Sequence, residues 1–196
     1  QQIFIISALS CKLTHMTTTL PSSRPQDSLT RVFLPILLFI LIACSSFKSI
    51  GRSPTDRAED VETMQMRCDI TGYAQNFLGI RYRYAGTAPK TGFDCSGFTS
   101  YILKEFNLKV SSCSSTQSRQ GARISLKEVL PGDLVFFGRR GRIQHVAMVV
   151  ENTPEGIICV HSTCSRGIVV ENISTSKYWK PKILFARDII SSQTAG

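Results

Sequence analysis

Two apolar, β-branched runs near the C-terminal end of the chain constrain its fold most. Residues 143–151, "IQHVAMVVE", and residues 156–162, "GIICVHS", are rich in the residue types that favour strands. The segment between them, "NTPE", followed by Gly156, has the composition of a turn. The two runs therefore predict an antiparallel hairpin with a loop of about five residues.

The register of this hairpin decides whether two histidines meet. If Val150 pairs with Gly156, His145 lies directly opposite His161, and both side chains point to the same face of the sheet. A slip of one residue along one strand would separate the rings, and loop length does not exclude such a slip. Each histidine taken singly also fits an ordinary surface or core position. The pattern predicts a pair of imidazoles in the first register only.

The stretch "GFDCSGFTSYI", residues 92–102, predicts the start of a helix beside a cysteine. Apolar residues recur at helical spacing from Phe98, so a helix is expected to begin near Ser96 with Asp94 as its N-cap. Cys95 then lies in the first turn, where unpaired N–H groups favour a thiolate. The alternative is a buried cysteine that packs as a small hydrophobic residue.

Cys95, His145 and His161 together have the composition of a nucleophilic site. A cysteine nucleophile needs a base to take its proton, and that imidazole needs a polar partner on its other nitrogen. A second histidine can serve as this partner. Spacing alone does not settle which of the two imidazoles is the base.

The N-terminal part of the chain has the features of an export signal. Arg24 and Arg31 precede an apolar run from Val32 to Ala43, which is shorter than the roughly 20 residues that a membrane span needs. The run ends in "LIAC", which resembles the lipobox of bacterial lipoproteins and implies a lipid on Cys44. An ordinary cleaved signal and an uncleaved anchor are the alternatives.

The domain organisation follows from these features. We expect a leader and lipoprotein-type signal over residues 1–44, a tether over 45–68, one folded domain over 69–190 and a tail over 191–196. The net charge is +9, and its densest cluster is "GRRGR", residues 138–142. An exported basic chain favours an acidic polymer or an anionic membrane surface as its partner, and not nucleic acid.

Seven cysteines do not form a recognisable framework. With Cys11, Cys44 and Cys95 set aside, the pairing of the remaining four stays open, and these are Cys68, Cys113, Cys159 and Cys164. Cys159 lies in an apolar run and is expected to be packed. No C-x-x-C motif occurs, so no metal site is expected.

Five motifs in the same order resemble the NlpC-type papain-like cell-wall endopeptidases. They are "YRYAG", "FDCSGF", "PGDLVFFG", "HVAMVV" and "VHST". The resemblance covers the chain from about Tyr73 to Ile190. It implies that Cys95 is the nucleophile, His145 the base and His161 the residue that orients the base. It also implies that no cofactor is needed.

The resemblance extends to positions around the cysteine. Tyr82 matches the family's tyrosine beside the active site, and Asp94 and Ser96 match substrate-contacting positions, with the backbone N–H of Cys95 as an oxyanion donor. Each has a simpler interpretation, as a strand aromatic, a helix cap and a first-turn residue.

"PGD" is interpreted as a turn before a core strand. Gly97 would allow close packing of the helix or close approach of substrate. Ala85 replaces the first glycine of the family's usual pair, and a minor backbone adjustment is expected.

Pattern and resemblance together predict an α+β, papain-like fold in which the helix bearing Cys95 packs on a five- to six-stranded antiparallel sheet. The expected strands are 133–137, 143–151, 156–161, 167–173 and 184–188, and a helix over 70–78 comes first.

The resemblance implies a cysteine peptidase of peptidoglycan stem peptides, cleaving the bond between γ-D-glutamate and the diamino acid. A cysteine amidase or acyltransferase of the same fold, or a non-catalytic murein-binding module, are the alternatives. The expected location is the cell envelope, with a lipid anchor in a membrane and the domain on the periplasmic or outer-membrane face. The choice between inner and outer membrane stays open.

Overall fold

The structure is a computed structural model that describes the backbone of residues 54–194 and the side chains of residues 59–194. The predicted signal segment and the lipobox with Cys44 lie outside these residues. Among the helices that the structure describes, none is long and apolar enough to cross a membrane.

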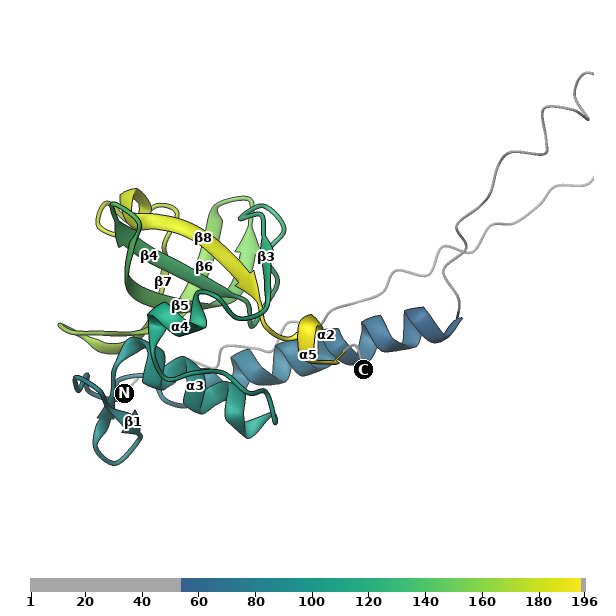
Figure 1. The fold of residues 1–196 in the computed structure, drawn as a ribbon, viewed down its shortest axis with the longest axis horizontal. Helices are drawn as coiled ribbons and strands as arrows, with labels where there is room; N and C mark the ends of the chain where they lie inside the picture. Colours follow the sequence, from purple (N-terminus) through teal and green to yellow (C-terminus); the bar gives the residue numbers. More distant parts are fainter. Residues whose placement is uncertain (1–53, 195–196) are drawn as a thin grey trace, which may run out of the picture. The chain divides into compact units, whose positions relative to one another are not determined.

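An antiparallel sheet forms the centre of the fold (Figure 1). Its six strands lie in the order β3-β8-β4-β5-β6-β7, so that neighbours in sequence are mostly neighbours in space. The strands are β3 Ala122–Ile124, β4 Leu134–Arg139, β5 Arg142–Thr153, β6 Gly156–Thr163, β7 Gly167–Asn172 and β8 Ile183–Asp188. The five predicted strands are confirmed, with ends displaced by at most a few residues. The short edge strand β3 was not predicted.

Helices cover one face of this sheet. α2 (Pro54–Gln75) and α3 (Cys95–Glu105) lie together below it in Figure 1, and α3 contacts β5 and β6. The shorter elements are β1 Thr87–Ala88, β2 Gly92–Phe93, α4 Ser114–Gln117, a 3₁₀ turn Lys180–Lys182 and α5 Ser191–Thr194. The α+β, papain-like fold is therefore confirmed.

Both faces of the central strands are buried, which explains the uninterrupted apolar text of β4. Leu134 and Phe136 face a core shared with Phe98 and Ile102 of α3. Val135 and Phe137 face a second core on the opposite side, together with buried residues of β5, β6 and β8. A strand that is buried on both faces reads as a continuous hydrophobic run and not as an alternation.

Helix α2 continues across the boundary that the sequence placed between residues 68 and 69. Arg67, in the segment expected to be a tether, is 1% exposed. Its guanidinium donates hydrogen bonds to the carboxylates of Asp133 and Asp188, with a distance of 2.7 Å in each case. Asp133 of the "PGD" motif is thus more than a turn residue, because it holds the helix against the sheet. The helix predicted over 70–78 ends earlier, at Gln75, and begins at Pro54.

The register predicted for the β5–β6 hairpin is wrong. Val149 pairs with Cys159 and Thr153 with Gly156, and the register shifts between Val149 and Glu151. The strands extend into "NTPE", so that only two residues, Pro154 and Glu155, separate them. The expected loop of about five residues was too long, because the bulge absorbs the extra residue and turns the strand toward a tighter hairpin.

Candidate active site

The N-terminus of α3 presents Cys95 as the first residue of the helix. Asp94 is its N-cap, and its Oδ1 accepts hydrogen bonds from the Gly97 N–H at 2.6 Å and the Ser96 hydroxyl at 3.1 Å. The predicted cap is confirmed. These bonds assign Asp94 and Ser96 to the helix start, and their contact with substrate stays a prediction.

Gly97 lets the helix start approach the preceding segment. A Cβ on Gly97 would lie 2.0 Å from the carbonyl oxygen of Gly86, a distance that real structures do not tolerate. Of the two interpretations given above, close packing of the helix therefore holds in this structure. Gly86 in turn accepts a hydrogen bond from the Asp94 N–H, which fixes the residue before the cysteine.

Cys95 is 9% exposed. Burial raises the pKa of this thiol above its ordinary value, and the N–H of Val146 opposes that shift without cancelling it. The N–H groups of Cys95 and Ser96 at the helix start lower the pKa of the thiol, as the sequence predicted, but the effect of desolvation is larger. The influence of Val146 places the sulfur beside β5, next to His145 in sequence.

The two imidazoles meet although the predicted register is wrong. Nε2 of His145 lies 2.8 Å from Nδ1 of His161. Extending the observed Met148–Val160 pairing by one residue sets His161 opposite Ala147, so the histidines are diagonal neighbours on one face. Diagonal side chains on neighbouring strands are within reach when they are long or aromatic. The pairing of His145 with His161 is confirmed, and the direct opposition is not.

A carboxylate and an indole that the sequence analysis missed extend this pair. Nε2 of His161 lies 2.8 Å from Oε1 of Glu171 in β7, and Trp179 donates its Nε1–H to the same oxygen at 2.9 Å. The Trp179 ring stacks on His145, with centroids 4.5 Å apart and planes at 23°. The signal for Glu171 was an acid directly after the apolar run "GIVV". Its partner could be found only from the β6–β7 register.

The pKa values of both histidines are lowered, which favours their neutral forms. Burial, together with the charges of His161 and Lys182, lowers the pKa of His145 to about 3. Burial also lowers the pKa of His161, although Glu171 opposes the shift. A neutral imidazole has one donor and one acceptor nitrogen, as a base next to a thiol requires.

Tyr82 is half-buried and forms an isolated bridge with Phe93, two residues before the cysteine. Burial raises the pKa of its hydroxyl to about 12, and the Cys164 thiol and the charges of Cys95 and Asp94 add to this shift. The raised pKa keeps the hydroxyl protonated, so that it can donate a hydrogen bond. Tyr82 and Asp94 therefore lie near Cys95 at the start of α3, while His145 and His161 lie together on the sheet, and His145 precedes Val146, whose N–H acts on the Cys95 thiol.

The cysteines that remained open are unpaired. Cys68, Cys113 and Cys164 are exposed thiols, and Cys159 is buried in the second core, as expected. Within residues 59–194, no group of three histidine, cysteine or acidic side chains is arranged to hold a metal ion.

A cysteine at the start of a helix that packs on β5 and β6, the two strands that carry the paired imidazoles, is the arrangement expected of a papain-like cysteine hydrolase. The sequence model of the NlpC/P60 family matches residues 79–188, which is more than half of the chain. The chain therefore belongs to the NlpC/P60 family.

Three proteins illustrate the similarity. The chain is 32% identical over 124 residues to a gamma-DL-glutamyl hydrolase of Bacillus subtilis, covering 61% of this chain and 29% of that protein. It is 28% identical over 148 residues to the murein DD-endopeptidase MepS/murein LD-carboxypeptidase of Escherichia coli, covering 75% of this chain and 76% of that protein. A crystal structure of an NlpC/P60 family protein from Bacillus cereus superposes with a TM-score of 0.58 at 30% identity, covering 63% of this chain and 40% of that one. The chain spans less than a third of the length of the first curated relatives that it matches.

Proposed function

We propose that this protein is a cysteine peptidase that hydrolyses the stem peptides of peptidoglycan. Cys95 is the nucleophile, His145 the general base and His161 the residue that orients the base. The observation that carries the proposal is the 2.8 Å contact between His145 and His161, because His145 directly precedes Val146, whose N–H acts on the Cys95 thiol.

The reaction begins from a neutral thiol and a neutral imidazole. As the Cys95 sulfur attacks the carbonyl carbon, its proton passes to His145, and the carbonyl oxygen becomes an oxyanion. The Cys95 N–H and the Tyr82 hydroxyl are the donors available to that oxygen, and loss of such a donor costs about 10²- to 10³-fold in kcat. His145 then gives its proton to the leaving amine, and water releases the acyl group with His145 as base again.

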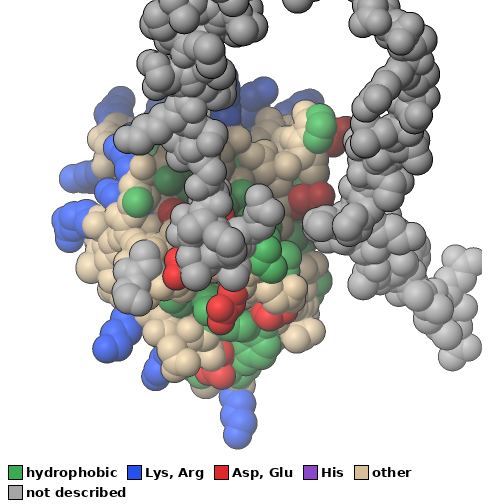
Figure 2. All heavy atoms as spheres, turned by 90° about the vertical axis from the view of Figure 1, so that its right-hand side faces the viewer, with side chains coloured by type: hydrophobic (Ala, Val, Ile, Leu, Met, Phe, Trp, Pro, Cys, Tyr) green, Lys and Arg blue, Asp and Glu red, His purple; other side chains and the backbone are tan. Residues whose placement is uncertain are grey.

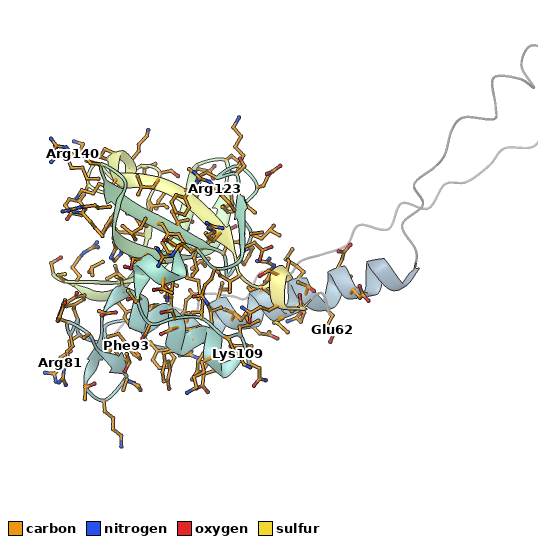
Figure 3. All side chains as sticks on the ribbon, in the orientation of Figure 1. Glu62, Arg81, Phe93, Lys109, Arg123 and Arg140 are labelled. Atoms are coloured by element: carbon orange, nitrogen blue, oxygen red, sulfur yellow. The ribbon has the colours of Figure 1, made fainter. Side chains whose placement is uncertain are left out.

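The charge around the site favours an anionic substrate. Arg139, Arg140 and Arg142 line a hollow of about 350 Å³ at the β4–β5 turn, and none of them is in an ion pair within the part of the chain that the structure describes. The β5 strand leads from this turn directly to His145. In Figure 3, Arg140 and Arg81 lie at the same end of the molecule, opposite Glu62. Stem peptides carry free carboxylates, which guanidinium groups bind well.

The opposite end of the molecule has a different character. Figure 2 faces this side and shows acidic side chains among hydrophobic ones, with Lys and Arg toward the edge of the view. A hollow of about 580 Å³ along α2 is lined here by Glu59, Glu62, Met64 and Leu130, among others. The three arginines of the β4–β5 turn, three or more residues from His145 along the chain, therefore support attraction of an anionic polymer to this part of the molecule.

Two bonds are candidates for cleavage. The name of the B. subtilis relative refers to a γ-glutamyl bond, which supports cleavage between γ-D-glutamate and the diamino acid. The name of the E. coli relative refers instead to DD-endopeptidase and LD-carboxypeptidase activity, and the match to it covers three quarters of both chains. We propose the first bond and keep the second as the rival.

Digestion of purified murein separates these possibilities. We expect soluble fragments with a new amino terminus on the diamino acid, identified by mass spectrometry. A new carboxyl terminus on D-alanine would support the rival bond. No fragments at all, with binding of murein retained, would support the non-catalytic module, and cleavage only of other amides would support an amidase or acyltransferase. The Cys95→Ala variant is expected to be inactive, while Cys159→Ala, which removes a buried thiol elsewhere, is the matched control.

We further propose that the protein is anchored in the cell envelope by a lipid on Cys44, with its domain facing the murein. The support is the apolar run and the lipobox-like "LIAC" alone. Metabolic labelling with an alkyne fatty acid is expected to mark the wild type and not a Cys44→Ala variant. Equal labelling of the two proteins would contradict the anchor.

A further inference from the structure

Glu171 lies at the end of a chain of contacts that begins at His145, the proposed base. The contacts run from His145 Nε2 to His161 Nδ1 at 2.8 Å, and from His161 Nε2 to Glu171 Oε1 at 2.8 Å. We propose that Glu171 and Trp179 are positioning residues that set the tautomers of both histidines and so make Nδ1 of His145 the basic atom. This inference rests on the proposed function.

The tautomers follow from the end of this chain. An ionised carboxylate only accepts hydrogen bonds, so His161 must carry its proton on Nε2 to bond Glu171. The Nδ1 of a neutral His161 then has a lone pair and accepts a bond from His145, whose proton must lie on Nε2. The remaining nitrogen of His145, Nδ1, is left with a free lone pair for the Cys95 proton. Reversing the tautomer of His161 would place two N–H groups, or two lone pairs, against each other.

Glu171 is held in its ionised form for this task. Burial alone would raise the pKa of its carboxyl, but the hydrogen bonds that it accepts from His161, Trp179 and Arg166 bring the pKa below its ordinary value. Three donors converge on one oxygen, Oε1, from His161 at 2.8 Å, Trp179 at 2.9 Å and Arg166 at 2.5 Å. Arg166 is 52% exposed, so solvent screens its share. The two ring donors are the contacts that fix the carboxylate.

Trp179 joins the two ends of the chain of contacts. Its ring stacks on His145 at 4.5 Å and lies 5.0 Å from His161, while its N–H holds Glu171. Phe137 packs at 5.6 Å from His145 and 5.1 Å from Trp179, which leaves His145 little freedom to rotate. One indole therefore controls both the orientation of the base and the position of the carboxylate that sets its tautomer.

Nitrogen-15 NMR of the imidazoles in the full chain, without substrate, tests the inference directly. Long-range proton–nitrogen correlations distinguish a protonated Nε2 from a protonated Nδ1. For the wild type we expect both rings to be neutral with the proton on Nε2. A proton on Nδ1 of His161 would overturn the inference, whatever the enzyme's activity. This readout is independent of turnover, so it separates failure of the inference from failure of the proposed function.

Kinetics of Glu171→Gln on murein fragments supply the second test. The change keeps size and removes the charge, so we expect a mixture of tautomers in the NMR spectrum. We also expect a fall of about 10- to 100-fold in kcat with little change in KM. Glu151→Gln, an exposed acid on β5, is the matched control and should leave both constants unchanged. Wild-type tautomers and kcat in Glu171→Gln would contradict the inference.

Trp179→Phe separates the two contributions of the indole. Phenylalanine keeps the ring stacked on His145 but removes the N–H that bonds Glu171. We expect a smaller loss of kcat, about threefold to tenfold, with a partial shift of the His161 tautomer. A loss of kcat with unaltered tautomers would show that Trp179 acts by packing alone and would overturn its link to Glu171.

Discussion

The guanidinium of Arg67 donates 2.7 Å hydrogen bonds to the carboxylates of Asp133, which directly precedes β4, and Asp188, the last residue of β8. Removing the cation would leave the 1%-exposed Asp133 without its charge partner. We expect Arg67→Met to lower the free energy of unfolding by about 3–5 kcal/mol, measured by urea denaturation. Arg119→Met, at an exposed position, should change it by less than about 0.5 kcal/mol. Equal effects of the two changes would contradict the anchoring role of Arg67.

Ala85 adopts a φ of +55°, in the left-handed region that favours glycine. This is the position at which the sequence departs from the family's glycine pair. Ala85→Gly is expected to raise the free energy of unfolding by about 0.5–1 kcal/mol, because the relief of strain exceeds the added freedom of the unfolded chain.

The neighbouring glycine provides the opposite control for the same turn. A Cβ on Gly86 would lie 2.3 Å from the carbonyl oxygen of Gly92, so Gly86→Ala should destabilise the protein and displace the segment that contacts the Cys95 helix. Thermal unfolding of both variants tests the pair, and a destabilised Ala85→Gly protein would contradict the strain at Ala85.

Cys113, and not the proposed nucleophile, is expected to be the most reactive thiol of the resting protein. It is exposed, and the Ser115 hydroxyl, 3.1 Å away, with nearby backbone N–H groups lowers its pKa to about 7. Burial raises the pKa of Cys95. Brief treatment with iodoacetamide at pH 7, followed by peptide mass spectrometry, should label Cys113 first. Labelling of Cys95 first would contradict this prediction and indicate a thiolate–imidazolium pair at rest. Because Cys113 is expected to react as well, inactivation by alkylation should be tested in a Cys113→Ser background.

The low pKa of His145 predicts a loss of stability in acid. The folded protein keeps His145 neutral down to about pH 3, whereas the unfolded chain binds the proton below about pH 6.5. The unfolded state therefore binds more protons between these values, and stability falls as the pH is lowered. By pH 5 the cost approaches about 2 kcal/mol. Urea unfolding of the wild type and His145→Gln at pH 7 and pH 5 should show the smaller fall in the variant, and parallel falls would contradict the shift.

The arginines of the β4–β5 turn are expected to act on charged substrate only. Arg140→Gln combined with Arg142→Gln should lower the rate on murein about tenfold at low salt, with the difference shrinking as salt is added. Hydrolysis of an uncharged, capped peptide should be unchanged. Lys127→Gln is the control, since Lys127 lies at the far end of the sheet, where its carbonyl contacts Asn152. A similar loss on both substrates would contradict a role in attraction.

Local chemistry explains what could be predicted from the sequence. The capped helix start at Asp94 and Cys95 depends on a few neighbouring residues, and the five strands follow from β-branched runs and turn residues. The β5–β6 register could not be predicted in this way, because the shift after Val149 depends on packing across two cores. The histidines still meet because diagonal neighbours are within reach of each other.

Long-range partners were beyond sequence reasoning for the same reason. Arg67 reads as part of a charged tether until Asp133 and Asp188 are brought to it. Glu171 and Trp179 have no motif of their own, and only the β6–β7 pairing and the 3₁₀ turn bring them to the histidines. Contacts that depend on the arrangement of several strands leave no local pattern.

The most direct test of the central claim is to trap the acyl-enzyme. The protein would be mixed with a purified stem peptide, quenched in acid within the first turnovers and analysed by mass spectrometry. We predict an added mass equal to the amino-terminal part of the peptide, located on Cys95 and absent from Cys95→Ala. Product formation by Cys95→Ala, or an adduct on any other residue, would contradict the account.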